Sequence, residues 1–106
     1  MIQKIVSQRL LANGVLQIGL GPDQNIGCFI FAHAGGSNAL VELFAIPNKR
    51  PDSTKSNYKI YHSTVAAGTT EVFKIEDIEL SFSDYTLEVE TDSNGAGQIM
   101  LTVLGT

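Results

Sequence analysis

The sequence predicts an all-β domain, an antiparallel β-sandwich or small jelly roll of seven to eight strands. Apolar residues recur mainly with a period of two, which places alternate side chains on the two faces of a strand. Clusters of Gly, Pro, Asn, Asp and Ser recur about every 8–12 residues, the turn spacing typical of all-β domains. With 106 residues, 43% of them hydrophobic, the chain can form a single domain (residues 1–106) whose core lies between two stacked sheets.

The N-terminal segments have the weakest pattern. Residues 2–11 could form a strand or a short helix. The recurring turns favour a strand, so residues 1–11 are expected to be an N-terminal arm or an edge strand. Residues 15–20 form the next predicted strand, which is bounded by Gly14 and by Gly21-Pro22.

The strands in the middle of the chain are better defined. Residues 26–33 are apolar at nearly every position, which predicts a strand buried on both faces or nearly so. A turn at residues 35–38 leads into a strand over residues 40–46, which Pro47 ends because proline cannot donate to the sheet ladder. Residues 47–57 contain no apolar residue except prolines. They form the longest loop, which either contacts a partner or is a solvated connection.

The C-terminal half continues the alternation. Its predicted strands span residues 58–65, 69–75, 85–91 and 99–103. Residues 65–69 form a hairpin-type connection, and residues 76–84 are a short strand or an irregular crossing. The strand over residues 85–91 has one wet, acidic face, and Asn94-Gly95 predicts a tight turn with positive φ. The predicted core consists of Cys28, Phe29, Ile30, Phe31, Leu43, Ile60, Leu87, Val89, Leu101 and Val103.

Charge and composition exclude several classes of protein. Residues 1–70 carry six basic and three acidic residues, whereas residues 71–106 carry one basic and eight acidic residues. The acidic C-terminal third would repel phosphate, which disfavours nucleic-acid binding, but the asymmetry could steer a basic face onto an acidic partner. No apolar run is long enough to cross a membrane. The N-terminal stretch lacks the apolar centre of a secretory signal, so we expect synthesis in a cytoplasm without export.

The residues that could carry catalysis have simpler structural explanations. Cys28 is the only cysteine, so it is expected to be a small buried hydrophobe. His33 and His62 have neither a nucleophile elbow nor the spacing of a metal pair, and structural roles are expected for both. Glu88 and Glu90 share a strand face about 7 Å apart, as an ordinary solvent-facing pair does. No enzymatic activity and no cofactor are expected.

The segment Asp92-Ser93-Asn94-Gly95 resembles the opening of a calcium loop. The glutamate that such a loop needs further on is missing, and Asn-Gly is the pattern of a tight turn. We therefore predict a turn and no metal site.

Several segments together carry a family resemblance. They are 12–16, 26–31, 41–44, 58–61, 65–70, 85–89 and 101–105. Their order resembles that of the small β-sandwich virion proteins of tailed bacteriophages, where an Ala-Ala/Pro-Gly-Thr turn typically precedes a strand. The resemblance implies a structural protein of the virion, assembled in the host cytoplasm, and in particular a capsid decoration (cement) subunit that binds and stabilises the major shell. It carries over no functional residue.

The expected partner is the major capsid protein or another virion protein, and a homo-oligomer, with a trimer favoured, is also expected. The candidate contacts to an acidic neighbour are Lys49, Arg50, Lys4 and Arg9. The face with Glu88 and Glu90 would then point to solvent or to a basic site. The alternative function is a carbohydrate- or receptor-binding module of a phage tail or fibre, which needs exposed aromatic rings. The available rings are those of Tyr58, Tyr61 and Tyr85.

Overall fold

A computed structural model describes residues 2–11, 15–18, 26–47, 54–74 and 85–106. Its elements are β1 (Gln3–Arg9), β2 (Val15–Ile18), β3 (Ile26–His33), β4 (Ala39–Pro47), the 3-10 helix η1 (Lys55–Tyr58), β5 (Lys59–Val65), β6 (Thr70–Lys74), β7 (Tyr85–Thr91) and β8 (Ile99–Gly105). The part of the chain described here holds no helix long and apolar enough to cross a membrane. Of the sequence predictions, the segment 76–84 and most of the loop 47–57 lie outside the described residues.

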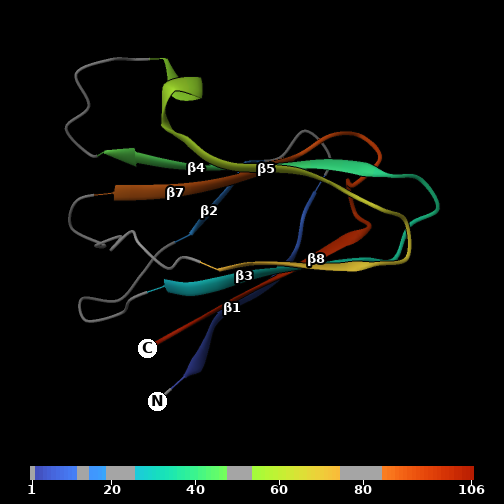
Figure 1. The fold of residues 1–106 in the computed structure, drawn as a ribbon, viewed down its shortest axis with the longest axis horizontal. Coiled ribbons are helices and arrows are strands. Elements are labelled where there is room, and N and C mark those ends of the chain that lie inside the picture. Colours follow the sequence, from blue (N-terminus) through green and yellow to red (C-terminus); the bar gives the residue numbers. More distant parts are fainter. Residues whose placement is uncertain (1, 12–14, 19–25, 48–53, 75–84) are drawn as a thin grey trace.

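The strands form two four-stranded sheets that stack in two layers (Figure 1). Sheet I has the order β1-β8-β3-β6, and sheet II has the order β2-β7-β4-β5. All neighbouring strands are antiparallel. The pairing is nested: β1 pairs with β8, β2 with β7, β3 with β6, and β4 with β5. This is the topology of a jelly roll, one long hairpin folded over on itself, and the predicted all-β sandwich is confirmed.

The connection at residues 65–69 is a tight turn, but it does not join a hairpin. Its backbone closes through the Thr69 N–H, which donates to the Ala66 carbonyl at 3.1 Å, and Gly68 has a φ of 74°. β5 lies in sheet II, however, and β6 pairs with β3 in sheet I. The prediction of a hairpin is therefore wrong, because turn chemistry reverses the chain direction without deciding which strand the next one pairs with.

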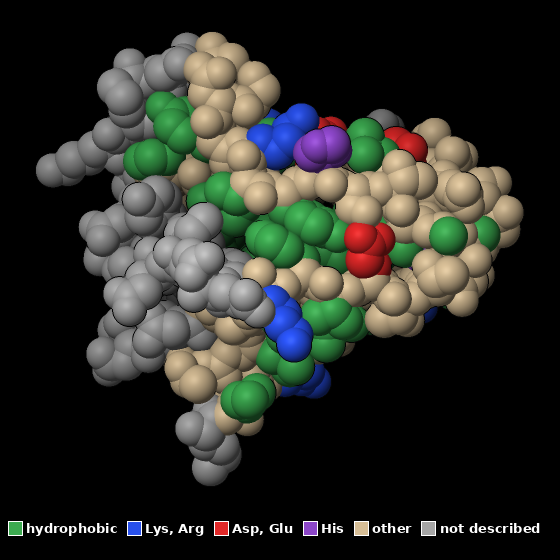
Figure 2. All heavy atoms as spheres, in the orientation of Figure 1, with side chains coloured by type: hydrophobic (Ala, Val, Ile, Leu, Met, Phe, Trp, Pro, Cys, Tyr) green, Lys and Arg blue, Asp and Glu red, His purple; other side chains and the backbone are tan. Residues whose placement is uncertain are grey.

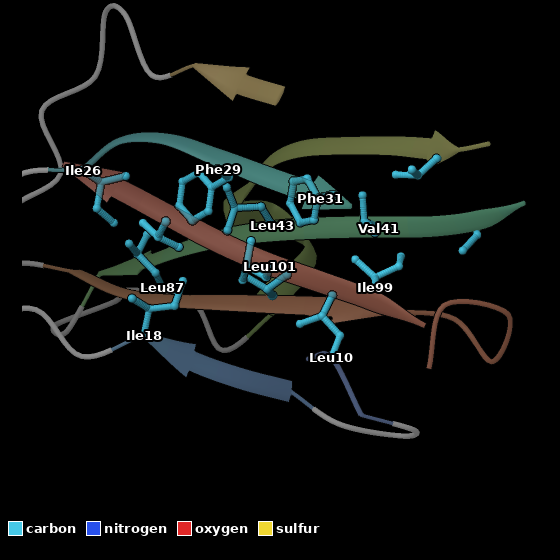
Figure 3. Packing of buried hydrophobic residues seen from close by; sticks show 14 of the residues in the cluster. Leu10, Ile18, Ile26, Phe29, Phe31, Val41, Leu43, Leu87, Ile99 and Leu101 are labelled. Atoms are coloured by element: carbon cyan, nitrogen blue, oxygen red, sulfur yellow. The ribbon is translucent and has the colours of Figure 1, made fainter. Parts of the chain in front are cut away.

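The core lies between the inner faces of the two sheets. In Figure 3 the labelled side chains of both layers, among them Phe29, Leu43 and Leu101, point toward one another. The predicted core residues that are fully or almost fully buried are Phe29, Phe31, Leu43, Leu87, Val89, Leu101 and Val103. These residues come from both sheets, which confirms that the core is shared.

Three predicted core residues, Cys28, Ile30 and Ile60, are only half-buried. Cys28 and Ile30 alternate along β3 with the buried residues Phe29 and Phe31, so they point to the outer face of sheet I. The expectation that β3 is buried on both faces or nearly so therefore holds for its inner side, while its outer side is only half-buried. Ile60 lies at a register shift on the edge strand β5, where it packs against the core without being enclosed.

One side of the sandwich is closed by side chains from β5 and β6. The ring of Tyr61 stacks on that of Phe73, with centroids 4.3 Å apart. The carboxylate of Glu71 accepts hydrogen bonds from the Tyr61 hydroxyl at 2.6 Å and the Ser63 hydroxyl at 2.5 Å. Figure 2 shows a strip of hydrophobic side chains with an acidic one between the two layers. These contacts bridge the sheets where no backbone ladder joins them.

The turns at residues 34–38, 66–69 and 92–98 are joined to one another at one end of the sandwich. The side-chain oxygen of Asn38 accepts the Ala67 N–H at 3.1 Å, and the Asn94 amide donates to the Asn38 carbonyl at 3.2 Å. The backbone adds two bonds: the N–H of His33, the last residue of β3, donates to the Thr69 carbonyl, and the N–H of Ala34 donates to the Gln98 carbonyl, both at 2.9 Å. The three turns therefore form one hydrogen-bonded end.

Asp92 organises the last of these turns. One carboxylate oxygen accepts the N–H groups of Asn94 and Gly95 at 3.1 and 3.2 Å, and the other accepts the Leu40 N–H at 3.1 Å. The predicted turn is confirmed. The expected positive φ is wrong for Gly95, however, and is found at Gly97 instead, with a φ of 74°. Gly95 is needed for its lack of a side chain, because a Cβ there would lie 2.0 Å from Thr91 Oγ1.

Candidate partner-binding surface

The outer face of sheet I is built by strand alternation. Phe29, Phe31, Leu101 and Val103 point inward, so their neighbours along the strands point outward. Antiparallel register places these outward residues opposite one another across the sheet. The rows across β1, β8, β3 and β6 are Lys4, Leu104, Cys28 and Lys74; Ser7, Thr102, Ile30 and Val72; and Arg9, Met100, Ala32 and Thr70.

The middle of this face is apolar apart from Thr102 on β8. The outward apolar side chains of the central strands are half-buried, and they are Cys28, Ile30, Ala32, Met100 and Leu104. Val72, on the edge strand β6, is 49% exposed. The other exposed large hydrophobics among the described residues are Ile2, just before β1 in the sequence, and Leu11, shortly after it. No described element packs on this side of sheet I. An apolar sheet face of this kind, open as far as the described residues go, is typical of an interaction surface.

Basic side chains stand on the margins of the same face. Lys4 and Arg9 lie on β1 and Lys74 lies on β6, the two edge strands of sheet I. None of the three forms an ion pair with a residue that the structure describes, and no acidic residue occupies an outward position in the rows above. The structure thus brings two of the predicted contacts, Lys4 and Arg9, to one face.

The other predicted contacts, Lys49 and Arg50, lie outside the described residues. Lys74 belongs to the face but was missed by the sequence analysis. Because Lys74 alternates with the inward residue Phe73, it points to the outer side of its strand. Which sheet that strand belongs to follows only from the pairing of β6 with β3. That pairing links distant segments and has no local signal.

The outer face of sheet II has a different electrostatic character. Glu88 and Glu90 face Lys55 of η1, which lies 3.5 Å from Glu88 and donates to Glu90. The hydrogen bond to Glu90 raises the pKa of Lys55 above its ordinary value, although partial burial opposes this. Lys59 pairs with Glu42. The glutamates thus face a basic group supplied by their own chain.

Phe44 lies beneath these charges. Its ring is almost fully buried, although it is on the outward side of β4, and the Lys55 ammonium lies 4.8 Å from the ring centroid. This cation–π contact, together with the ion pairs, covers the only phenylalanine on the described outer side of sheet II. Among the described elements, η1 therefore covers part of the outer face of sheet II, and none packs on the outer face of sheet I.

The histidines do not form a catalytic or metal site among the described residues. His33 is buried, and its Nδ1 accepts the Gly35 N–H at 3.1 Å. The proton therefore sits on Nε2, which donates to the Ser37 carbonyl at 2.6 Å. Both nitrogens hold the β3–β4 turn, which confirms a structural histidine. His62 is exposed on β5, and the described residues contain no group of three metal-ligating side chains.

A shallow, open depression of about 200 Å³ lies at the turn end of the sheet I face. The last row of the face supplies Arg9, Ala32, Thr70 and Met100 to it, and the turns add residues such as Gln98. Arg9 is fixed at its rim, because Nη1 donates to the Gly97 carbonyl at 3.0 Å. The depression therefore combines an apolar floor with polar donors.

The tyrosines proposed for stacking on sugars are not gathered at this site. Tyr61 is part of the contact between β5 and β6, and burial, followed by its bond to Glu71, raises its pKa above the usual 10.0. Tyr58 is half-buried in η1, and the side chain of Tyr85 lies outside the described residues. The described structure offers no tyrosine to a ligand in the depression.

Comparisons of the chain with protein-family models, curated proteins and solved structures found no match. The functional argument therefore rests on the residues and geometry of the chain itself.

Proposed function

We propose that the chain is a non-enzymatic structural protein of a bacteriophage particle, a capsid decoration (cement) subunit that stabilises the major shell. The outer face of sheet I binds the major capsid protein or another virion protein. The observation that supports this most is the open apolar centre of that face, bordered by Lys4, Arg9 and Lys74. An apolar centre with a charged rim is the usual anatomy of a protein interface.

The fold supports the proposal at a coarser level. Jelly rolls serve in viral capsid proteins and also in lectins, so the architecture fits the sequence resemblance but does not decide between functions. The open face narrows the choice, because binding a flat protein surface needs an apolar area whereas binding a sugar needs exposed aromatic rings.

A homotrimer is part of the proposal, with the sheet I face left for the shell. Packing this face against its own copy would bring Lys4, Arg9 and Lys74 of both subunits to the same interface. Like charges opposed in this way cost association energy. A trimer is therefore expected to use other surfaces, and analytical ultracentrifugation measures its formation.

Charge reversal tests the attachment face. Lys4→Glu combined with Lys74→Glu is expected to slow binding to purified particles that lack this protein, most strongly at low salt where screening is weakest. The matched variant carries Lys49→Glu and Arg50→Glu in the polar loop. If only the loop variant slows binding, the sheet I face is not the attachment surface. If neither variant differs from wild type at low salt, then neither the sheet I face nor the polar loop is the attachment surface.

The copy number in purified particles separates the proposed function from its alternative. Hundreds of copies per particle support a shell subunit. A handful of copies, together with binding on a glycan array, would support a carbohydrate- or receptor-binding module of a tail or fibre. Tyr61 does not support that alternative, because its ring stacks on Phe31 and Phe73 within the fold.

A further inference from the structure

We infer that the depression at the turn end of the sheet I face is an anchor for a carboxylate, which an aspartate or glutamate side chain of the shell protein inserts. Arg9 is the residue that holds it. The inference rests on the proposed function for the identity of the partner, but the site itself is argued from the geometry of the depression.

Arg9 is held in place before any partner binds. Its Nη1 donates to the Gly97 carbonyl at 3.0 Å, and the Gly97 N–H donates to the Leu10 carbonyl at 2.5 Å. The guanidinium is therefore fastened to a turn that is itself bonded to the end of β1. Since a guanidinium has five N–H donors in a planar fork, this bond leaves others for a carboxylate. A donor fixed in this way loses little conformational freedom on binding.

The walls of the depression are fixed as well. Thr70 and Gln98 supply a hydroxyl and an amide, which can add neutral donors to the charged one. The turns that carry the walls are bonded to β3, through His33 to Thr69 and through Ala34 to Gln98. A charge-assisted hydrogen bond is about twice as strong as a neutral one. Ala32 and Met100 add apolar surface to the lining, against which the methylene groups of an aspartate or glutamate side chain can pack.

The surroundings favour a protein carboxylate over a glycan. Drug-sized ligands occupy pockets of roughly 300–1,000 Å³, and this depression is smaller, at about 200 Å³. Among the described residues that line it, the one aromatic ring is that of His33, whose nitrogens are both bonded within the turn. The next outward row of the sheet, beside the lining residues Ala32 and Thr70, contains Ile30 and Val72. A partner that covers this row must itself present apolar surface, as a protein does.

The first test needs no particle. Isotope-labelled protein is titrated with N-acetyl-glutamate amide, with N-acetyl-glutamine amide as the neutral control, and backbone amide shifts are followed by NMR. We expect saturable shifts at Thr70, Gly97 and Gln98 with the charged probe only, and their loss in Arg9→Gln. Absence of these shifts in wild type overturns the inference and leaves the proposed function standing. Tighter binding of N-acetylneuraminic acid at the same amides overturns it in favour of a glycan.

The second test measures dissociation from particles. Arg9→Gln and Arg9→Lys are each expected to raise the dissociation rate about tenfold or more, because lysine keeps the charge but lacks the fork. Lys4→Gln, on the same strand and face but outside the depression, is the matched control and should mainly slow association. Wild-type dissociation of Arg9→Lys would overturn the anchor. Binding by all variants at wild-type rates would overturn the inference but not shell binding itself.

Thermal unfolding and a milder variant control for damage to the fold. Thr70→Val keeps Arg9 and its bond to Gly97, and it removes one hydroxyl from the wall. It is expected to weaken the NMR-detected binding of the charged probe severalfold while keeping the melting temperature of wild type. An unchanged affinity in this variant would contradict the part assigned to Thr70.

Discussion

At the scale of single residues, the fold depends on a few close approaches that only one residue type permits. At Gly95 a Cβ would lie 2.0 Å from Thr91 Oγ1 and 2.8 Å from Ile99 Cδ1. Thr91 cannot simply turn away, because its hydroxyl donates to the Leu40 carbonyl at 3.0 Å. The β7–β8 turn thus fits against β4 because position 95 has no side chain.

Gly95→Ala is therefore expected to lower the free energy of unfolding by about 1–3 kcal/mol through overpacking. Gly36→Ala is the matched control, since nothing lies within 4 Å of the added Cβ and φ is not in the left-handed region. That change should stay within about 0.5 kcal/mol of wild type. Urea unfolding measures both, and equal losses in the two variants would contradict the close approach at Gly95.

Tyr61 gives a prediction for pH. Burial and the bond to Glu71 raise its pKa above 10.0, so in the native state it keeps its proton to higher pH than in the unfolded chain. Between those two pKa values the unfolded chain binds fewer protons, and the free energy of unfolding falls as pH rises. The contribution is fully present below about pH 10. It is lost as pH rises through the native pKa.

Urea unfolding of wild type and Tyr61→Phe between about pH 8 and 11.5 tests this. Wild type should lose stability above about pH 10 more steeply than the variant, which lacks the titrating hydroxyl. At pH 8 the variant should be less stable by about 1 kcal/mol, because it lacks the bond to Glu71. Parallel pH profiles would show that Tyr61 does not titrate as the geometry requires.

At the scale of elements, the apolar residues of β3 predict the position of the strand and its inward side chains, but not the burial of its outer side. The position of the strand and its inward residues Phe29 and Phe31 follow from the apolar period of two. Burial of its other side was inferred from Cys28 and Ile30, which are only half-buried. An apolar side chain on an outer face has the same sequence pattern as one buried in the core. The candidate surface was hidden from sequence analysis for this reason.

The two sides of β3 should therefore respond differently to substitution. Phe31→Ala, and likewise Leu101→Ala on the neighbouring β8, should cost about 2–5 kcal/mol because each leaves a cavity in the core. Ile30→Ala, on the open side, should cost about 1 kcal/mol and weaken binding to particles. Chemical denaturation and particle binding measure the two effects. Equal destabilisation by Phe31→Ala and Ile30→Ala would contradict the inward and outward assignment.

The turns were predicted better than the pairing of the strands they join. The signals at residues 65–69 and 92–97 locate real turns, yet both cross between the sheets. Local residues fix the reversal, whereas pairing depends on burying the inner faces of strands that are distant in the sequence. Lys74 was missed as a site residue for the same physical reason.

At the scale of the whole molecule, nested pairing redistributes the charge. The sequence places basic residues early and acidic residues late, which suggested two separate regions. In the fold, β1 lies beside β8 and β2 beside β7, so the two ends of the sequence are interleaved. Among the described residues, the charges differ between the outer faces of the two sheets: Lys4 and Lys74 lie on sheet I, whereas the glutamates on sheet II are paired with lysines.

The molecule is also expected to be stable without metal ions. Both carboxylate oxygens of Asp92 already accept backbone N–H groups, so the turn needs no cation. A chelator should leave the melting temperature unchanged, and added calcium should not raise it. Scanning calorimetry with and without both additions measures this. A large fall in the melting temperature with the chelator would instead indicate a calcium site at residues 92–95.

The nested pairing also determines how the chain can fold. Among the described strands, only β4 and β5 are both successive and paired, whereas β1 pairs with β8, with Gln3 opposite Gly105. Contacts between distant segments carry a large loop-closure cost, which successive inner pairs reduce. We expect folding to begin near β4 and β5 and to proceed outward in milliseconds to seconds, as is usual for topologies of high contact order. Until β1 docks, the outer edge of β8 remains unpaired and open to other chains.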